Sequence, residues 1–156
     1  MSRHFIKTAT LLLGSFVLCV QPTFAQDAGS EESLYDRLGG LPAISVVVDD
    51  FINAMYEDEE INKNPAVGEA RDRIPAAYFK YHLTAMVCQV TGGPCQYHGR
   101  PMKPAHYHLN ITEAEWDRMV VLFKGTLAKF NVPEKEVGEL VEIVGTTKKD
   151  IVRAGT

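Results

Sequence analysis

The chain has 156 residues, room for one ordinary domain, and 46% of them are apolar, which is enough for a packed core. Its formal net charge is −4, from 16 Lys and Arg against 20 Asp and Glu. Lys and Arg form no cluster along the sequence, so this charge pattern argues against a nucleic-acid partner.

Residues 1–25 have the pattern of a secretory signal peptide. Arg3 and Lys7 precede an apolar run over residues 11–20, and small residues precede Gln26. A membrane anchor would need about 20 apolar residues, and this run is much shorter. We therefore expect an exported protein, periplasmic or secreted, with no stable membrane insertion after cleavage.

The first predicted elements follow a short flexible segment over 26–33 and open a domain over 34–153. A short helix ends at Gly39 and Gly40, because glycine tolerates the left-handed conformation of a helix end. Pro42 then fits the first turn of a longer helix. Its apolar residues recur every three or four positions: Ile44, Val47, Val48, Phe51, Ile52 and Met55.

The middle of the domain begins with a polar stretch. Residues 57–73 are interrupted by Pro65 and Gly68, and we expect a loop there with at most one turn of helix. Pro75 opens the next helix, which ends at "TGGP". The apolar face of this helix comprises Phe79, Leu83, Met86, Val87 and Val90.

Three further helices are predicted towards the C-terminus. A short one covers 102–109, and Thr112 with Glu115 forms a capping box that opens another. Pro133 lies near the start of the last helix. The apolar faces of the two long helices comprise Trp116, Met119, Val120, Phe123 and Leu127, then Val137, Leu140, Val141, Val144 and Ile151. No segment alternates with period two, so the fold class is all-α.

Two cysteines remain after cleavage, Cys88 and Cys95. In an oxidising compartment they can pair, and they can equally stay as two separate buried thiols. The sequence leaves both alternatives open.

The mature chain has four histidines: His82, His98, His106 and His108. On a helix, His106 and His108 are about 200° apart and cannot hold the same ion, which disfavours zinc. Signatures of serine or cysteine nucleophiles and of a phosphate-binding loop are absent from the sequence.

His106 shares a helical face with Met102, while His108 points away. A single histidine on an apolar face is more often a core residue than a ligand. Residues on two other helices would, however, line a large flat cavity: Phe79, Leu83 and Met86 on one, Trp116, Met119 and Phe123 on the other. A lone imidazole beside an apolar slot is how haem iron is held, although both faces could simply form core.

From Leu34 to Val152 the sequence resembles the group I truncated haemoglobins. The matching stretches are "LYDRLGG", "VVVDDF", "TGGPCQYHGRPM", the histidine of "KPAH", "LNITEAEW" and "KFNVPEKEVGELVEIVGTTKKDIV". The resemblance implies a shortened globin with helix pairs stacked two over two around haem b. It also implies that His106 is the proximal iron ligand and that Tyr97 and Met102 contact the cofactor.

The sequence departs from the family on the distal side. Ile52 stands where many members have a tyrosine that hydrogen-bonds bound oxygen, Leu83 where many have a glutamine, and Phe79 where the family often has a leucine or glutamine. The usual polar contact with oxygen is therefore missing. His82 shares the face of Phe79 and Met86, and in some members a histidine at the matching place binds iron. Here it could bind iron, contact a haem propionate, or lie at the rim of the pocket.

These residues favour a haem protein that binds diatomic gases, O2, NO or CO. The resemblance also suggests oxidation of nitric oxide to nitrate, with an unknown electron donor, so the sequence leaves open whether the protein is an enzyme. A rival hypothesis is electron transfer or redox and gas sensing at iron held by His106 and His82 together. A third is a helical interaction domain that has lost haem.

Overall fold

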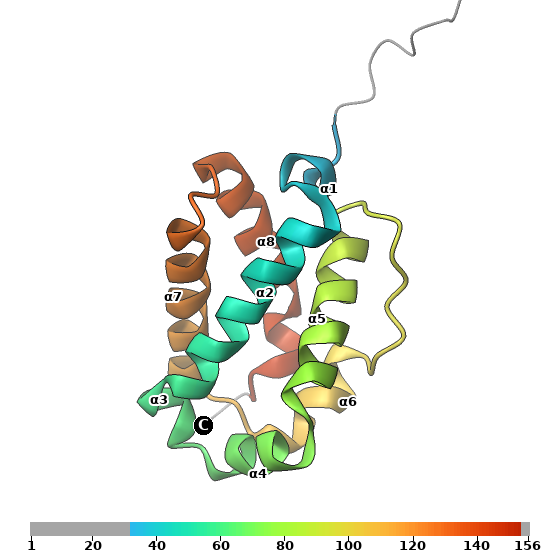
Figure 1. Ribbon diagram of the computed structural model, residues 1–156. Coiled ribbons are helices and arrows are strands. Elements are labelled where there is room, and N and C mark those ends of the chain that lie inside the picture. Colours follow the sequence, from blue (N-terminus) through green and yellow to red (C-terminus); the bar gives the residue numbers. More distant parts are fainter. Residues whose placement is uncertain (1–31, 154–156) are drawn as a thin grey trace, which may run out of the picture. The chain divides into compact units, whose positions relative to one another are not determined.

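The computed structural model describes residues 32–153, and within them the chain is helical without a strand, which confirms the all-α prediction (Figure 1). The predicted signal peptide and residues 26–31 lie outside the described part. The helices are α1 (Leu34–Arg37), α2 (Gly40–Glu57), α3 (Glu59–Asn62), α4 (Pro65–Arg73), α5 (Ala76–Val90), α6 (Met102–His106), α7 (Glu113–Lys129) and α8 (Glu134–Ile151), with a 3₁₀ turn, η1 (Tyr107–Leu109), after α6.

Helix α2 is the centre of the packing. It lies against α5 on one side and α7 on the other, while α6 packs against α8 (Figure 1). The residues that α2 buries are Ile44, Val48, Phe51 and Ile52. A second buried group joins α1, α7 and α8 through Leu34, Leu127 and Leu140. Two helix pairs therefore share one core, as the period of three to four residues predicts.

Gly40 and Gly93, one from each glycine pair of the sequence, lie against Tyr35. Gly39 and Gly40 have φ of 87° and 73°, which disfavour any residue with a Cβ. The Tyr35 hydroxyl accepts a hydrogen bond from the Leu41 N–H at 3.0 Å. A Cβ on Gly93 would come within 2.4 Å of the Tyr35 ring. Glycine is therefore required where the end of α5 approaches α1.

The prediction of a loop over residues 57–73 is wrong, because α3 and α4 form there. The Asp58 carboxylate caps α3 by accepting from the Ile61 N–H at 3.0 Å, and Asn64 caps α4. Asp58 also pairs with Arg118 of α7 at 2.5 Å, which lowers the pKa of its carboxyl. Helix α4 buries none of its residues. Its sequence therefore lacks the periodic apolar residues from which a helix is predicted.

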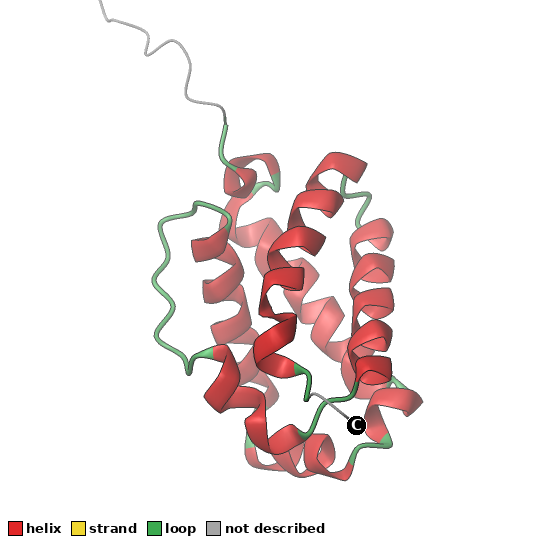
Figure 2. Cartoon of the chain, turned by 180° about the vertical axis from the view of Figure 1, so that it is seen from behind, coloured by secondary structure: helices red, strands yellow, loops and turns green. Residues whose placement is uncertain are grey.

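Cys88 and Cys95 form a disulfide, with their Cα atoms 5.7 Å apart, so the paired alternative is the correct one. Cys88 is fully buried at the end of α5. The bridge ties α5 to the long loop over 91–101, which runs along the outside of the bundle towards α6 (Figure 2). None of the helices in residues 32–153 is long and apolar enough to cross a membrane.

Candidate haem site

His106 is the last residue of α6, and a backbone bond holds its ring. The ring nitrogen Nδ1 lies 2.8 Å from the Met102 carbonyl oxygen, four residues earlier. Because a carbonyl can only accept, Nδ1 carries the hydrogen and Nε2 keeps a free lone pair. Burial lowers the pKa of His106, against the opposing effect of the Met102 bond, so the ring is neutral. A neutral imidazole with one nitrogen fixed by a carbonyl is the form that binds a metal.

His108 lies on the exposed surface, two residues further along. The predicted difference between the two histidines is thus present: His106 is half-buried, and His108 is in the solvent. His98, in the loop over 91–101, is exposed as well. The described residues contain no group of three or more His, Cys, Asp or Glu side chains that could hold a metal ion.

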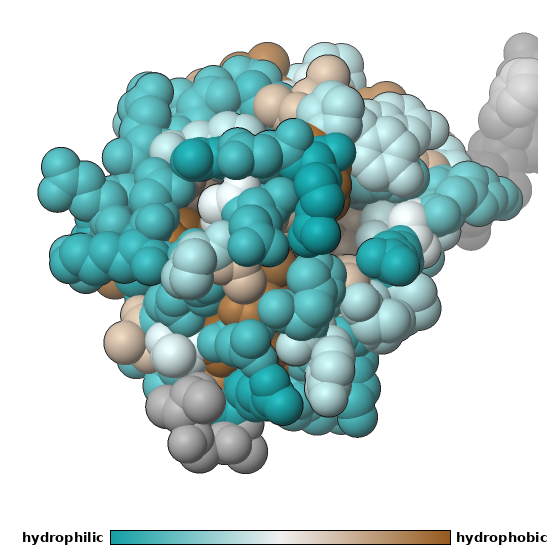
Figure 3. All heavy atoms as spheres, turned by 90° about the horizontal axis from the view of Figure 1, so that it is seen from below, coloured by the Kyte–Doolittle hydropathy of each residue, from teal (hydrophilic) through white to brown (hydrophobic). Residues whose placement is uncertain are grey.

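Several of the apolar side chains predicted to contact the cofactor are only partly covered. The half-buried ones among the predicted contacts are Phe79, Leu83 and Met86 of α5, Met102 of α6, and Met119 and Phe123 of α7. Four of them, Phe79, Leu83, Met119 and Phe123, pack against the α2 core. Figure 3 shows apolar atoms at the floor of an opening framed by polar residues, on the face seen from below. Partly covered apolar surface inside a helical body is suited to a flat apolar cofactor.

Two predicted contacts are already buried by protein. Ile52 has no exposed surface and belongs to the α2 core. Trp116 is 5% exposed, and the Lys148 ammonium lies 5.9 Å from the centre of its ring. Both side chains are therefore covered by protein in this structure.

His82 is enclosed by aromatic rings on α5 and the loop over 91–101. Its ring centre lies 4.3 Å from that of Tyr78, 5.2 Å from Tyr81 and 6.0 Å from Tyr97, all edge to face. Its Nδ1 is buried and has no hydrogen-bond partner. Tyr97 is fixed in turn, because its N–H donates to the Gln89 side chain at 2.6 Å and its hydroxyl donates to the Arg100 carbonyl at 2.8 Å. Burial raises the pKa of Tyr97.

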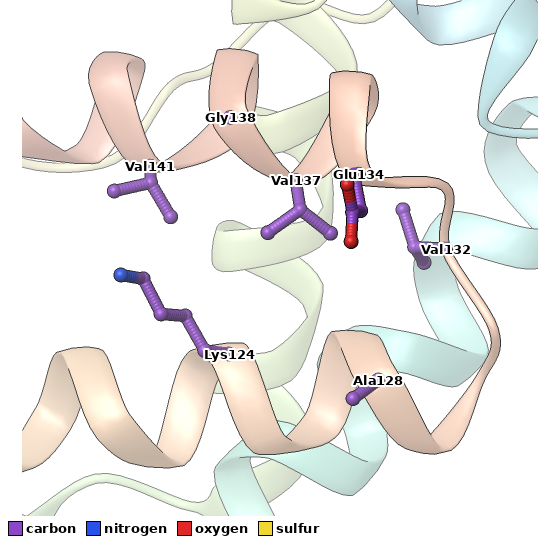
Figure 4. Close-up of a pocket in the computed structure, with 7 residues that line it drawn as sticks. All are labelled: Lys124, Ala128, Val132, Glu134, Val137, Gly138 and Val141. Carbon is purple, nitrogen blue, oxygen red and sulfur yellow. The ribbon is translucent and has the colours of Figure 1, made fainter.

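An apolar groove of about 380 Å³ lies between α7 and α8, and it is a separate feature (Figure 4). Lys124, Val137 and Val141 extend into the space between the two helices. None of the predicted site residues lines this groove.

Sequence reasoning missed two residues that hold the chain after His106. The Asn64 side chain donates to the Leu109 carbonyl at 2.9 Å, and the Arg153 N–H donates to the Ile111 carbonyl at 3.0 Å. For Asn64 a signal was present, since Asn before Pro65 is typical of a helix start. No local signal in the sequence connects Arg153 to Ile111.

A family model described as bacterial-like globin matches residues 33–153. The chain belongs to this family. Relatives are the group 1 truncated haemoglobins GlbN of Nostoc commune, 35% identical over 54% of this chain and 67% of that protein, and of Mycolicibacterium paratuberculosis, 28% identical over 76% and 83%. The chain is a group 1 truncated haemoglobin, which confirms the family predicted from the sequence.

Solved structures agree with this fold. The 2/2 haemoglobin of Synechococcus sp. PCC 7002, in the cyanomet state with covalently attached haem, matches with a TM-score of 0.69 and 28% identity over 78% of this chain and 98% of that one. The Fe(III) form of truncated haemoglobin from Tetrahymena pyriformis matches with a TM-score of 0.69 at 22% identity, again over 78% and 98%. The two-over-two globin fold is thereby confirmed.

The residues present fit the haem that a globin binds. The free Nε2 of His106 can bind iron, and the half-buried apolar side chains of α5, α6 and α7 can cover the porphyrin. The Nδ1 of His82 is a second polar nitrogen, and it is buried without a hydrogen-bond partner.

Proposed function

We propose that this truncated haemoglobin reversibly binds diatomic gases, O2, NO or CO, at haem iron held by Nε2 of His106. The observation that carries the proposal is the 2.8 Å bond between His106 Nδ1 and the Met102 carbonyl. That bond commits one ring nitrogen to the protein and leaves the other for iron. Haem, when bound, supplies the iron that takes the gas as a ligand.

The protein contributes a weakly polar distal wall. Phe79 and Leu83 are half-buried and carry no hydrogen-bond donor, and Ile52 lies buried behind them. A hydrogen bond to a bound gas contributes about 1 kcal/mol, which is several-fold in affinity. We therefore expect fast release of oxygen rather than tight storage.

Absorption spectra of the purified ferric and ferrous protein, with and without CO, test the proposal. His106→Ala should lose or greatly weaken the Soret band, whereas His108→Ala, a change of the same kind on the exposed side, should keep it. Equal loss in both variants would contradict the role of His106. A wild-type protein that binds no haem would favour a helical interaction domain instead.

A second candidate function is electron transfer or redox and gas sensing, with His82 as the sixth iron ligand. The observation that favours it is the buried and unpaired Nδ1 of His82, because such atoms usually have a partner. A low-spin six-coordinate spectrum in the absence of gas would support this candidate. A five-coordinate or water-bound spectrum would place His82 at the rim or on a haem propionate.

Oxidation of nitric oxide to nitrate is a further activity that we propose for the gas-binding protein. It rests on membership of the family and requires an electron donor that returns the iron to its ferrous state. Nitrate formation from nitric oxide and oxygen, measured with the ferrous wild-type protein and with His106→Ala, tests it. Equal rates in the two proteins would contradict it.

We also propose that the protein is exported. The pattern of residues 1–25 and the disulfide between Cys88 and Cys95 both support this location, because such bridges persist in oxidising compartments. N-terminal sequencing of protein from the periplasmic fraction should begin near Gln26. An intact Met1 on a cytoplasmic product would contradict it.

A further inference from the structure

The side chain of Asn64 joins two parts of the chain that are 45 positions apart. Its Oδ1 accepts from the N–H groups of Ala66 and Val67 at 3.0 and 3.4 Å, which caps α4. Its Nδ2 donates to the carbonyl oxygen of Leu109 at 2.9 Å. Both ends of one amide are thus used, one for a helix start and one for the turn that follows His106.

The segment that receives this bond is held from the other side as well. Arg153, just after α8, donates its N–H to the Ile111 carbonyl at 3.0 Å and its guanidinium to the Asn110 side chain. The same guanidinium lies 5.3 Å from the centre of the Tyr107 ring. Asn110 itself has a left-handed φ of 51°, which marks a sharp change of direction. The backbone just after His106 is therefore fixed between α4 and the end of α8.

External contacts of this kind matter because α6 is short. It comprises five residues, and an isolated helix of that length is not stable in water. The bond from His106 to the Met102 carbonyl fixes the ring relative to α6, but it does not fix α6 relative to the rest of the protein. That second alignment depends on the packing of α6 against α8 and on what holds the chain at each end of α6.

We infer that Asn64 is a positioning residue for His106. The hydrogen bond from its side-chain amide to the Leu109 carbonyl sets the orientation in which the imidazole meets the haem iron. The inference rests on the proposed function, because it takes His106 as the iron ligand. Residues behind a metal ligand commonly change metal affinity when they are removed, by fixing the orientation of that ligand. Asn64 would do so from the start of α4, with α4 and α5 between it and α6 in the chain.

Substitutions at Asn64 separate its two bonds. Asn64→Asp and Asn64→Ser both keep an oxygen that can cap α4. The Asp carboxylate has no donor for Leu109, and the Ser hydroxyl ends one bond short of the amide nitrogen that makes this contact. Asn62→Ser is the matched control, since Asn62 donates to the Tyr56 carbonyl at 2.8 Å and pairs with Arg71 without touching the proximal segment. Circular dichroism should show unchanged helix content in all three variants.

Two measurements report on the iron rather than on general stability. One is the rate at which haem transfers from the holoprotein to excess apomyoglobin. The other is the iron–histidine stretching band of the ferrous protein by resonance Raman, recorded with His82→Leu so that no distal imidazole masks it. We expect haem transfer to be roughly fivefold faster in Asn64→Ser and Asn64→Asp, the size of one lost hydrogen bond, with a shifted band. Asn62→Ser should keep the wild-type rate and band.

Wild-type values in both Asn64 variants would overturn the inference, and so would equal changes in Asn62→Ser, which would indicate a general loss of stability. If the wild-type protein takes up no haem, the proposed function fails first and this inference fails with it. Haem uptake by the wild type with unaltered Asn64 variants would leave the proposed function intact and remove this inference alone.

Discussion

Two segments hold their histidine rings by different interactions. We call α6 with residues 107–111 the proximal segment and α5 with the loop over 91–101 the distal segment, after the sides of haem that we propose for them. His106 has a hydrogen bond from its ring to the backbone, and the chain beyond it is bonded to Asn64 and Arg153. His82 makes edge-to-face contacts with three tyrosine rings, and its buried Nδ1 is unpaired.

The difference concerns how freely each imidazole can turn. His106 cannot rotate without losing a directional bond in a partly buried place, which leaves Nε2 in one position. Aromatic contacts contribute about 0.5–1.5 kcal/mol each and permit several orientations, so His82 can exchange them for another partner. If both rings face haem iron, as we propose, this contrast predicts a permanent ligand on the side of His106 and an adjustable one on the side of His82.

The largest expected effect is that of His82→Leu on gas binding. If His82 occupies the sixth position and leaves it open about 1–10% of the time, its removal should speed CO binding about 10- to 100-fold. The spectrum should change from low spin to five-coordinate or water-bound, while haem retention stays as in the wild type. An unchanged spectrum and rate would mean that His82 is not a ligand, and the distal side would then be open rather than adjustable.

Removal of the disulfide should destabilise the distal segment. Cys88→Ala combined with Cys95→Ala opens a short closed loop that we expect to contribute about 2 kcal/mol. Thermal unfolding should shift down by roughly 5–10 °C for a domain of this size. Thiol titration of the mature wild-type protein, unfolded without reductant, should detect no free thiol from this pair, and two free thiols would contradict the bridge.

A polar group added to the distal wall should slow oxygen release. Leu83 is half-buried on α5, and Leu83→Gln would place an amide donor there. We expect oxygen dissociation to slow by roughly fivefold, the worth of about 1 kcal/mol, when measured in the His82→Leu background. Leu83→Met, which has a similar length and no donor, is the control. Equal slowing in both would indicate a steric cause.

The smallest expected effect concerns acid and the proximal ring. Burial lowers the pKa of His106 from its ordinary value of 6.5 in the folded chain. Above that value the ring is neutral whether the chain is folded or unfolded. Below it the unfolded chain takes up a proton that the folded chain resists, so stability falls as the pH falls. Urea unfolding of the haem-free protein between pH 7.5 and about pH 5 should show a shallower loss in His106→Leu than in the wild type.

Much of the fold could be predicted because its causes are local. The capping box of Thr112 and Glu115 is present at the start of α7, as the spacing of three positions between these residues predicts. The opposite exposure of His106 and His108 follows from helical geometry over two residues. The apolar face of α2 could be recognised from its period, and the residues it buries are among those expected.

Other features depend on contacts that no local pattern encodes. Helix α4 has no buried residue, so its existence depends on the Asn64 cap and on the bonds that α3 and α4 make to distant segments. Whether Cys88 and Cys95 would pair depended on a Cα separation of 5.7 Å, which only the folded path of the loop provides. Tyr97 meets His82 for the same reason, although 15 positions separate them.

The sequence by itself therefore determined most of the helices, their apolar faces and the different exposure of His106 and His108, because period and capping act over three or four residues. Only the tertiary structure decided how that histidine is aligned and what surrounds its distal counterpart. Asn64 reaches Leu109 and Arg153 reaches Ile111 across 45 and 42 positions, and such pairs form only after the helices pack. Their partners are set by the shape of the packed core, which no single segment specifies.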